Sequence, residues 1–362
     1  MNLRQATLLG WALLLAALGL LALGVCVGST GFENLLPALL GRGVAPDGGP
    51  LATDAVALAR QIVWDIRLPR TLGAWTAGAL LGLAGALAQG LFRNPLADPF
   101  LLGSASGASL GVALALAALG GAGGMLGGGM MSGSFTVFGS GWATRLGLTG
   151  AAFVGAVGAV LLTLALSKGV QHTVRLLLAG VVVGVVLGAL THLVLLASPE
   201  SLQAMQAFML GSTAFVGWTA CALMALTWAL ASAAGALLAR GLDALSLGEA
   251  TALSLGLPLG ALRLALVAVL ALATGAAVAQ TGLIAFVGLA APHLVRAAVK
   301  TPHGRLLILS SLMGGVLLMA ADTLARGLIA PQELPVGVLT AVLGGGYLLW
   351  LMHRGTMRGG AA

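Results

Sequence analysis

Long apolar runs alternate with short polar breaks along this chain of 362 residues. A helix needs about 20 predominantly apolar residues to cross a bilayer, and about ten segments approach that length. These segments are Leu8–Val27, Leu68–Ala88, Phe100–Leu119, Leu146–Leu166, Arg175–Leu196, Phe215–Leu238, Leu259–Val278, Leu283–Val299, Leu306–Ile329 and Pro335–Met352. The pattern predicts an all-α, polytopic membrane protein with about ten transmembrane helices, in which residues 1–362 form a single transmembrane domain.

The most distinct polar break is Arg93–Pro99, where two prolines stiffen a turn and Asp98 can cap the next helix. Basic residues gather on the cytoplasmic side of membrane proteins. With a cytoplasmic N-terminus, the inside of the membrane would carry about twice as many Lys and Arg residues as the outside. We therefore expect this break and both termini to lie in the cytoplasm.

Two longer polar segments are expected outside the membrane, at about residues 29–61 and 120–142. The first should contain a short interfacial helix around Leu35–Leu40. The second is rich in glycine and methionine. Methionines can bind a soft metal or haem, but adaptable packing of a loop is the favoured interpretation.

A third polar interruption predicts a short cytoplasmic helix at about residues 243–255. Asp243 or Ser246 can cap its start and Gly256 can end it. Its apolar residues, Leu245, Ala250, Leu253 and Leu257, would share one face. Such a helix either binds a partner protein or rests on lipid headgroups.

The composition is that of a membrane protein, and it excludes some classes of partner and ligand. The chain is 59% hydrophobic and 7% charged, with a mean hydropathy of +1.07, which excludes an ordinary soluble domain. Its net charge of +7 comes from singly scattered basic residues, so we expect no nucleic-acid partner. Cys26 and Cys221 lie at apolar positions without metal-ligand spacing, and we expect no metal site. The first apolar run has no small-x-small cleavage site, which favours a retained span over a cleaved signal.

Three function classes fit a membrane protein of this kind. No Gly-x-x-x-x-Gly-Lys-Ser/Thr loop is present, so active transport would draw energy from a partner or an ion gradient. A gradient-driven transporter should place ionisable residues at mid-membrane, whereas Arg263, Asp322 and Arg326 lie towards helix ends. A membrane enzyme would need a catalytic constellation, and the five dispersed histidines form no His-Glu-x-x-His motif. We therefore predict no catalytic residue.

Motifs spread over nearly the whole chain resemble the permease subunit of type II ATP-binding-cassette importers, which take up iron–siderophore complexes, haem and cobalamin. These motifs are Arg67-Leu68-Pro69-Arg70, Arg93–Pro99, Leu176-Leu177-Leu178-Ala179-Gly180, Gly282–Leu289, Pro292–Arg296, Ala321-Asp322 and Glu333–Val338. One departure is Gly344–Tyr347, where the family often has Gly-x-Pro. The resemblance implies the type II permease fold.

The resemblance also implies a set of partners. These are a second copy of the chain in a homodimer, two ATPase subunits and a periplasmic or lipid-anchored substrate-binding protein. ATP and Mg would bind to the ATPase, and no cofactor would bind to this chain. The location implied is the bacterial cytoplasmic (inner) membrane. An iron–siderophore complex or haem is the expected cargo, cobalamin is possible, and a gradient-driven transporter of a small solute is the alternative.

Arg67, Arg70 and Arg326 match outside arginines of the family that meet acidic residues on the binding protein. Exposed ion pairs of this kind steer and orient association more than they strengthen it. Alternatively, Arg67 and Arg70 anchor a helix end at the headgroups, and Arg326 pairs with Asp322 one turn away.

Three further sets of residues take their roles from the resemblance. Asn94, Leu96 and Thr173 match positions of a cytoplasmic gate. The helix that couples to the ATPase would include Asp243, Leu247, Gly248, Glu249 and Leu253. The translocation path between the two subunits would be lined in part by Gly180, Gly184 and Gly188.

Overall fold

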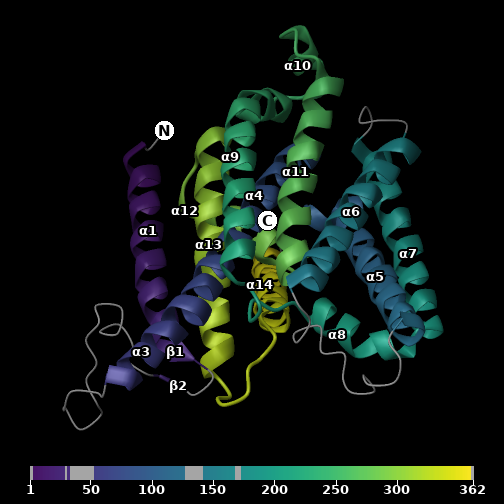
Figure 1. Cartoon of the computed structure of the whole chain (residues 1–362). Coiled ribbons are helices and arrows are strands. Elements are labelled where there is room, and N and C mark those ends of the chain that lie inside the picture. Colours follow the sequence, from purple (N-terminus) through teal and green to yellow (C-terminus); the bar gives the residue numbers. More distant parts are fainter. Residues whose placement is uncertain (1–2, 29–30, 33–52, 127–141, 168–172, 360–362) are drawn as a thin grey trace.

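A computed structural model describes residues 3–28, 31–32, 53–126, 142–167 and 173–359 of the chain (Figure 1). Its helices are α1 (Leu3–Cys26), α3 (Thr53–Ile62), α4 (Leu68–Phe92), α5 (Ser104–Leu126), α6 (Trp142–Leu166), α7 (Thr173–Ala197), α8 (Leu202–Leu210), α9 (Trp218–Ser246), α10 (Glu249–Ser254), α11 (Leu259–Thr281), α12 (Val287–Ala298), α13 (His303–Gly327) and α14 (Val336–Gly359). Each predicted apolar run falls on one of these helices. The all-α prediction is therefore confirmed, apart from a two-residue antiparallel pairing of β1 (Val27–Gly28) with β2 (Gly31–Phe32).

Among the described residues, seven helical stretches are long and apolar enough to cross a membrane. Ser104–Ala118 and Val336–Trp350 are shorter apolar helices. The predicted span Leu283–Val299 needs correction, because only the 12 residues of α12 are helical. At 1.5 Å per residue α12 is about 18 Å long, which is less than the roughly 30 Å hydrocarbon core. Phe286, at φ 69°, provides the turn that precedes it.

The two predicted external segments are described only in part. Residues 33–52, with the expected helix around Leu35–Leu40, and residues 127–141 lie outside the described residues. The end of the first segment forms α3, which passes through a π-helical turn at Val63–Arg67 into α4. The start of the second segment, predicted at Gly120, is still helical, since α5 continues for six more residues to Leu126.

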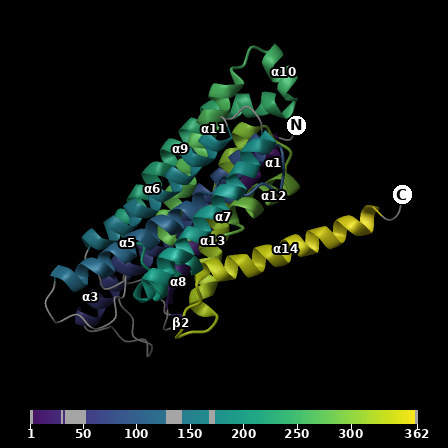
Figure 2. The same ribbon diagram turned by 90° about the vertical axis from the view of Figure 1, so that its right-hand side faces the viewer.

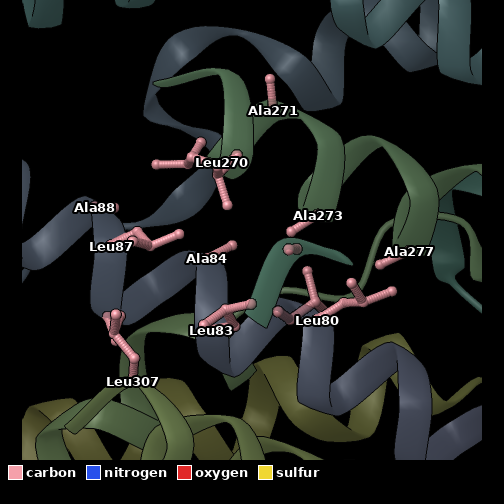
Figure 3. Close-up of a cluster of buried hydrophobic side chains, with 14 of the residues drawn as sticks. Leu80, Leu83, Ala84, Leu87, Ala88, Leu270, Ala271, Ala273, Ala277 and Leu307 are labelled. Carbon is pink, nitrogen blue, oxygen red and sulfur yellow. The ribbon is translucent and has the colours of Figure 1, made fainter. Parts of the chain in front are cut away.

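Helix α4 lies at the centre of the bundle and is buried almost throughout. Leucine and alanine side chains of α4 pack against α11 and α13 in the main core (Figure 3). The residues labelled there include Leu80, Leu83, Ala84, Leu87, Leu270, Ala273, Ala277 and Leu307. A polar break in such a helix would leave unpaired groups in the core, which explains why its sequence reads as one continuous apolar run.

Glycines bring α4 into direct backbone contact with its neighbours. A Cβ atom on Gly78 would lie 2.2 Å from the carbonyl oxygen of Gly314 on α13. A Cβ on Gly85 would lie 1.7 Å from the carbonyl oxygen of Gly288 on α12. Small residues permit this approach where lipid provides no hydrophobic driving force for helix association.

Functional segments gather at the two ends of the bundle. The N-terminus of α1 and the short helix α10 lie at one end in Figure 1, whereas α3, β1, β2 and α8 lie at the other. Helix α14 leaves this second end and projects from the side of the bundle, as Figure 2 shows. The end that carries α10 is the one predicted to face the cytoplasm.

Candidate functional site

A cluster of charged side chains is buried at the end of the bundle opposite α10. Asp322, on α13, is fully buried. Its Oδ1 accepts hydrogen bonds from Arg70 Nε at 3.3 Å and Arg70 Nη2 at 3.1 Å, and also from the Thr213 hydroxyl. Its Oδ2 accepts from Arg326 Nε at 2.9 Å. Arg70 Nη1 also pairs with Glu333 Oε2 at 2.8 Å. The Asp322 carboxylate thus binds two guanidinium groups and the hydroxyl of Thr213, which lies in a loop.

The same cluster holds the end of α1 against α4 and α13. Arg67 Nη1 donates to the carbonyl oxygens of Val25 at 3.0 Å and Cys26 at 3.2 Å. Arg326 Nη2 donates to the Thr71 hydroxyl at 3.1 Å, and that hydroxyl donates to the Arg67 carbonyl oxygen at 2.7 Å. Three helices that are far apart in sequence are thereby joined through charged and polar groups.

The three arginines predicted to dock a binding protein do lie together, but they are not exposed as expected. Arg67 is 7%, Arg70 8% and Arg326 1% exposed in this single chain. The alternative pairing of Arg326 with Asp322 is present, because the helical spacing of four residues places them on one face. The docking role itself stays a prediction.

At the other end, α9 continues four residues beyond Leu242 and includes Asp243. The predicted helix at 243–255 is therefore wrong in its bounds, since α10 covers only Glu249–Ser254. Asp243 accepts hydrogen bonds from the His303 backbone amide at 3.0 Å and ring Nδ1 at 2.7 Å. This contact fixes the end of α9 to the start of α13 and replaces the capping role expected for Asp243.

Helix α10 is held in place but presents leucines to its surroundings. Gly248 precedes it at φ +113°, a conformation that favours glycine. The Glu249 carboxylate pairs with the buried guanidinium of Arg263 on α11. Leu253 is 59% exposed, and Leu247 and Leu255 are more exposed still. The face predicted from Leu245, Ala250, Leu253 and Leu257 is not one surface, because Leu245 is buried on α9.

The break at Arg93–Pro99 forms a compact turn between α4 and a short 3-10 helix at Pro99–Leu102. Arg93 ends α4 in the left-handed conformation, at φ 50°. Asn94 Oδ1 accepts a hydrogen bond from the Leu96 backbone amide at 2.9 Å, which closes the turn. Leu96 is exposed, so this rigid turn carries a free apolar side chain at its tip.

Asp98 caps the 3-10 helix, as the sequence predicted, by accepting a hydrogen bond from the Phe100 amide at 2.8 Å. Burial of the carboxyl group raises the pKa of Asp98 to about 6, and the hydrogen bond from Phe100 opposes that rise. This carboxyl group therefore changes charge near neutral pH.

The glycines predicted to line a path differ in their surroundings on α7. A Cβ on Gly180 would lie 2.1 Å from the carbonyl oxygen of Leu101, so Gly180 serves close packing. A Cβ on Gly184 would make an ordinary contact with Ser106, and one on Gly188 would meet nothing within 4 Å. Thr173 is the first residue of α7.

Sequence reasoning missed several partners of the predicted residues. Thr213, Arg263 and His303 complete the two ends of the bundle, yet each is a single polar residue without a motif of its own. Glu333 lies in the motif Glu333–Val338, for which the sequence predicts no individual residue role. Within the described ranges, no group of three or more His, Cys, Asp or Glu side chains is arranged to hold a metal ion.

Comparison with known proteins covers nearly the whole chain. Residues 14–354 match the FecCD transport family. The hemin transport system permease HmuU of Yersinia pestis is 38% identical over 298 residues, which is 81% of this chain and 83% of that protein. The vitamin B12 import system permease BtuC of Salmonella typhimurium is 38% identical over 296 residues, 80% of this chain and 83% of that protein.

Solved structures share the fold. An inward-facing metal-chelate type ABC transporter aligns with a TM-score of 0.78 and 26% identity, over 96% of this chain and 99% of that one. PsaBC from Streptococcus pneumoniae, solved with a Fab, aligns with a TM-score of 0.54 and 17% identity, over 77% of this chain and 88% of that one. The second likeness bears on the fold alone.

Proposed function

The chain belongs to the FecCD transport family, and we propose that it forms the membrane path of an ATP-driven importer for a metal chelate. Haem or an iron–siderophore complex is the favoured cargo, and cobalamin is possible, because the similar proteins include a haem permease and a vitamin B12 permease. The gradient-driven alternative has less support, since Asp322 and Arg326 near the end of α13 pair with each other.

The observation that carries this proposal is helix α10. It extends beyond the other helices at one end of the bundle in Figure 1, where Leu253 on α10 and the flanking residues Leu247 and Leu255 are exposed. The pair between Glu249 and Arg263 holds α10 against α11, so a force on α10 is transmitted to a membrane-spanning helix. We propose that a separate ATPase subunit binds these leucines, and that its closure on ATP and Mg moves α11.

A negative charge introduced on α10 tests the proposed contact with the ATPase subunit. Leu253→Asp should lower stimulation of the ATPase by at least about tenfold, because buried apolar anchors dominate such interfaces. Thr251→Asp is the matched control, since Thr251 is also exposed and lies about 200° around the helix from Leu253. Equal stimulation by wild type and Leu253→Asp would contradict the proposed contact.

We further propose that the buried cluster shapes the docking face for a periplasmic or lipid-anchored binding protein. Arg67, Arg70 and Arg326 outnumber Asp322 and Glu333, which leaves a positive field at this end to attract acidic residues. Burial means that the three arginines act through this field and through the shape of the surface more than through exposed pairs.

Arg67→Gln tests the field, because Arg67 donates to the backbone carbonyl groups of Val25 and Cys26, while Asp322 and Glu333 keep their ion pairs with Arg70 and Arg326. Association with the binding protein should slow and become less dependent on salt. Arg60→Gln, at an exposed position of α3, is the control. Identical salt dependence in the Arg67 variant and the wild type would refute the role.

A second copy of the chain is proposed to complete the path. Helix α7 exposes apolar residues such as Val185 and Leu193 along its length, and Gly188 leaves open space beside it. A homodimer in the bacterial inner membrane would place this surface and Gly184 along the path. The turn at Asn94 and Leu96, with the start of α7 at Thr173, is proposed as the cytoplasmic gate, and both termini are proposed to lie on that side.

The gate can be tested without disturbing the turn. Leu96→Ser removes an exposed apolar side chain and leaves the hydrogen bond from the Leu96 amide to Asn94 intact. The variant should leak cargo from loaded vesicles in the absence of ATP. Leakage equal to that of the wild type would exclude Leu96 from the gate.

A further inference from the structure

A cavity of about 480 Å³ lies at the end of the bundle opposite α10 and is lined by residues of α5, α6, α8, α9 and α11. Its walls are mostly apolar and include Leu116, Leu148, Phe208, Leu223 and Ala279. Pockets of about 300–1,000 Å³ hold small organic ligands in other proteins. This volume and these walls suit a flexible apolar chain.

Among the described residues that line the cavity, five carry a hydroxyl or amide side chain: Thr149, Ser212, Thr219, Gln280 and Thr281. Gln280, on α11, and Thr149, on α6, both line the cavity. Neither side chain has a hydrogen-bond partner among the residues that the structure describes. A carboxamide and a hydroxyl can donate hydrogen bonds to an uncharged oxygen such as an ester carbonyl. No charged residue is among the described residues that line the cavity, so a ligand with a buried charge would be penalised.

The cavity continues into the apolar surface of α9. Leu223 is a wall residue and is also exposed, and the exposed residues Leu226 and Leu230 follow it at helical spacing. Figure 2 shows α9 on the side of the bundle opposite to the projecting helix α14. The leucines of this stripe are exposed in the single chain, so hydrocarbon chains of the bilayer can reach them.

A pair of tryptophans marks the level at which the cavity begins. Trp218 lines the cavity, and its ring centroid lies 5.3 Å from that of Trp64. The Trp218 Nε1 donates to the Trp64 carbonyl oxygen at 2.9 Å. Tryptophan side chains concentrate at the headgroup level of membranes. A chain that enters beside Trp218 and passes Leu223 would run from the interface into the hydrocarbon region.

We propose that this cavity binds one acyl chain of a phospholipid from the outer leaflet, with the ester group of the lipid at Gln280 and Thr149. The assignment depends on the membrane location of the chain but not on its cargo. The apolar walls take up the methylene groups, and the two polar side chains meet the uncharged ester oxygens.

Photolabelling tests the assignment with the full chain. The protein is reconstituted in bilayers of phosphatidylethanolamine and phosphatidylglycerol that contain a phospholipid with a photoreactive group on one acyl chain, and labelled peptides are mapped by mass spectrometry. We expect label on the cavity walls around Ala279 and Ala207, as well as on the exposed stripe of α9. Thr219 lines the cavity and is exposed, so Thr219→Trp should reduce wall labelling at least about tenfold, because each excluded methylene group weakens binding severalfold.

Leu230→Trp is the matched control, because it adds the same side chain on α9 outside the cavity. It should leave wall labelling unchanged. Ala220→Phe provides a second obstruction if Thr219→Trp fails to fold. Wall labelling that persists in a folded obstructed variant, or that occurs nowhere in the wild type, would overturn the proposal. Displacement of the label by haem or cobalamin would also overturn it, by making the cavity part of the cargo route.

Discussion

Removal of the Asp322 carboxylate is expected to be the most damaging single change at the end of the bundle opposite α10. Asp322 is fully buried and accepts hydrogen bonds from Arg70, Arg326 and Thr213. Asp322→Ala would leave two guanidinium groups, both less than a tenth exposed, without their shared counter-charge. Removal of one partner from a buried pair typically costs about 3–5 kcal/mol, since the remaining charge cannot regain its hydration.

Glu333→Gln is the control for this experiment. Glu333 pairs with Arg70 in the same cluster, but its side chain is 27% exposed, so the loss should be about 0–1 kcal/mol. Thermal unfolding in detergent can be followed with a thiol-reactive dye, because Cys26 and Cys221 are free and buried. The midpoint should fall much further for Asp322→Ala than for Glu333→Gln. Equal shifts would refute the claim that one carboxylate holds this end together.

Three other perturbations follow from the described contacts. Gly85→Val should prevent correct packing of α4 against α12, because even a Cβ would lie 1.7 Å from the Gly288 carbonyl oxygen. The yield of monodisperse protein measures the effect, and a near-normal yield would contradict this close contact. The pKa of Asp98 is raised to about 6, so ionisation of its carboxyl group destabilises the folded state. The stability of the wild type relative to Asp98→Asn should therefore decline as pH rises from about 4 through 6. A stability difference that does not change with pH would contradict this prediction. Glu249→Arg should uncouple ATPase activity from transport, and the exchange Glu249→Arg with Arg263→Glu should restore part of the coupling; failure of the exchange to restore any would indicate that their pairing is unimportant.

Hydropathy predicted where the chain crosses the membrane better than where its helices end. Each apolar run overlaps a helix, because backbone groups in lipid must be satisfied within the segment, although only 12 residues of Leu283–Val299 are helical. Helix α9, however, continues through Arg240 and Asp243 to Ser246. Polar residues mark the exit from the bilayer, and a helix can continue into water with no change in its backbone. The predicted coupling helix was therefore too long at its start.

The burial of the arginines could not be read from the sequence. Arg67 and Arg70 stand at the start of an apolar run, which is typical of residues at the headgroups. Their burial depends on the ends of α1 and α13 meeting the start of α4, and these contacts join residues 42 and 252 positions apart in the chain. The pairing of Arg326 with Asp322 was predictable, because it depends only on helical spacing.

ATP-dependent uptake tests the central claim most directly. Proteoliposomes that contain this chain and its ATPase would receive the binding protein with labelled haem, a ferric siderophore or cobalamin on the side opposite α10. We predict accumulation of one of these chelates that requires ATP, Mg and the binding protein, and that is abolished by Leu253→Asp but retained by Thr251→Asp. Uptake driven by an ion gradient without ATP, or no uptake of any chelate by the complete assembly, would contradict the proposed function.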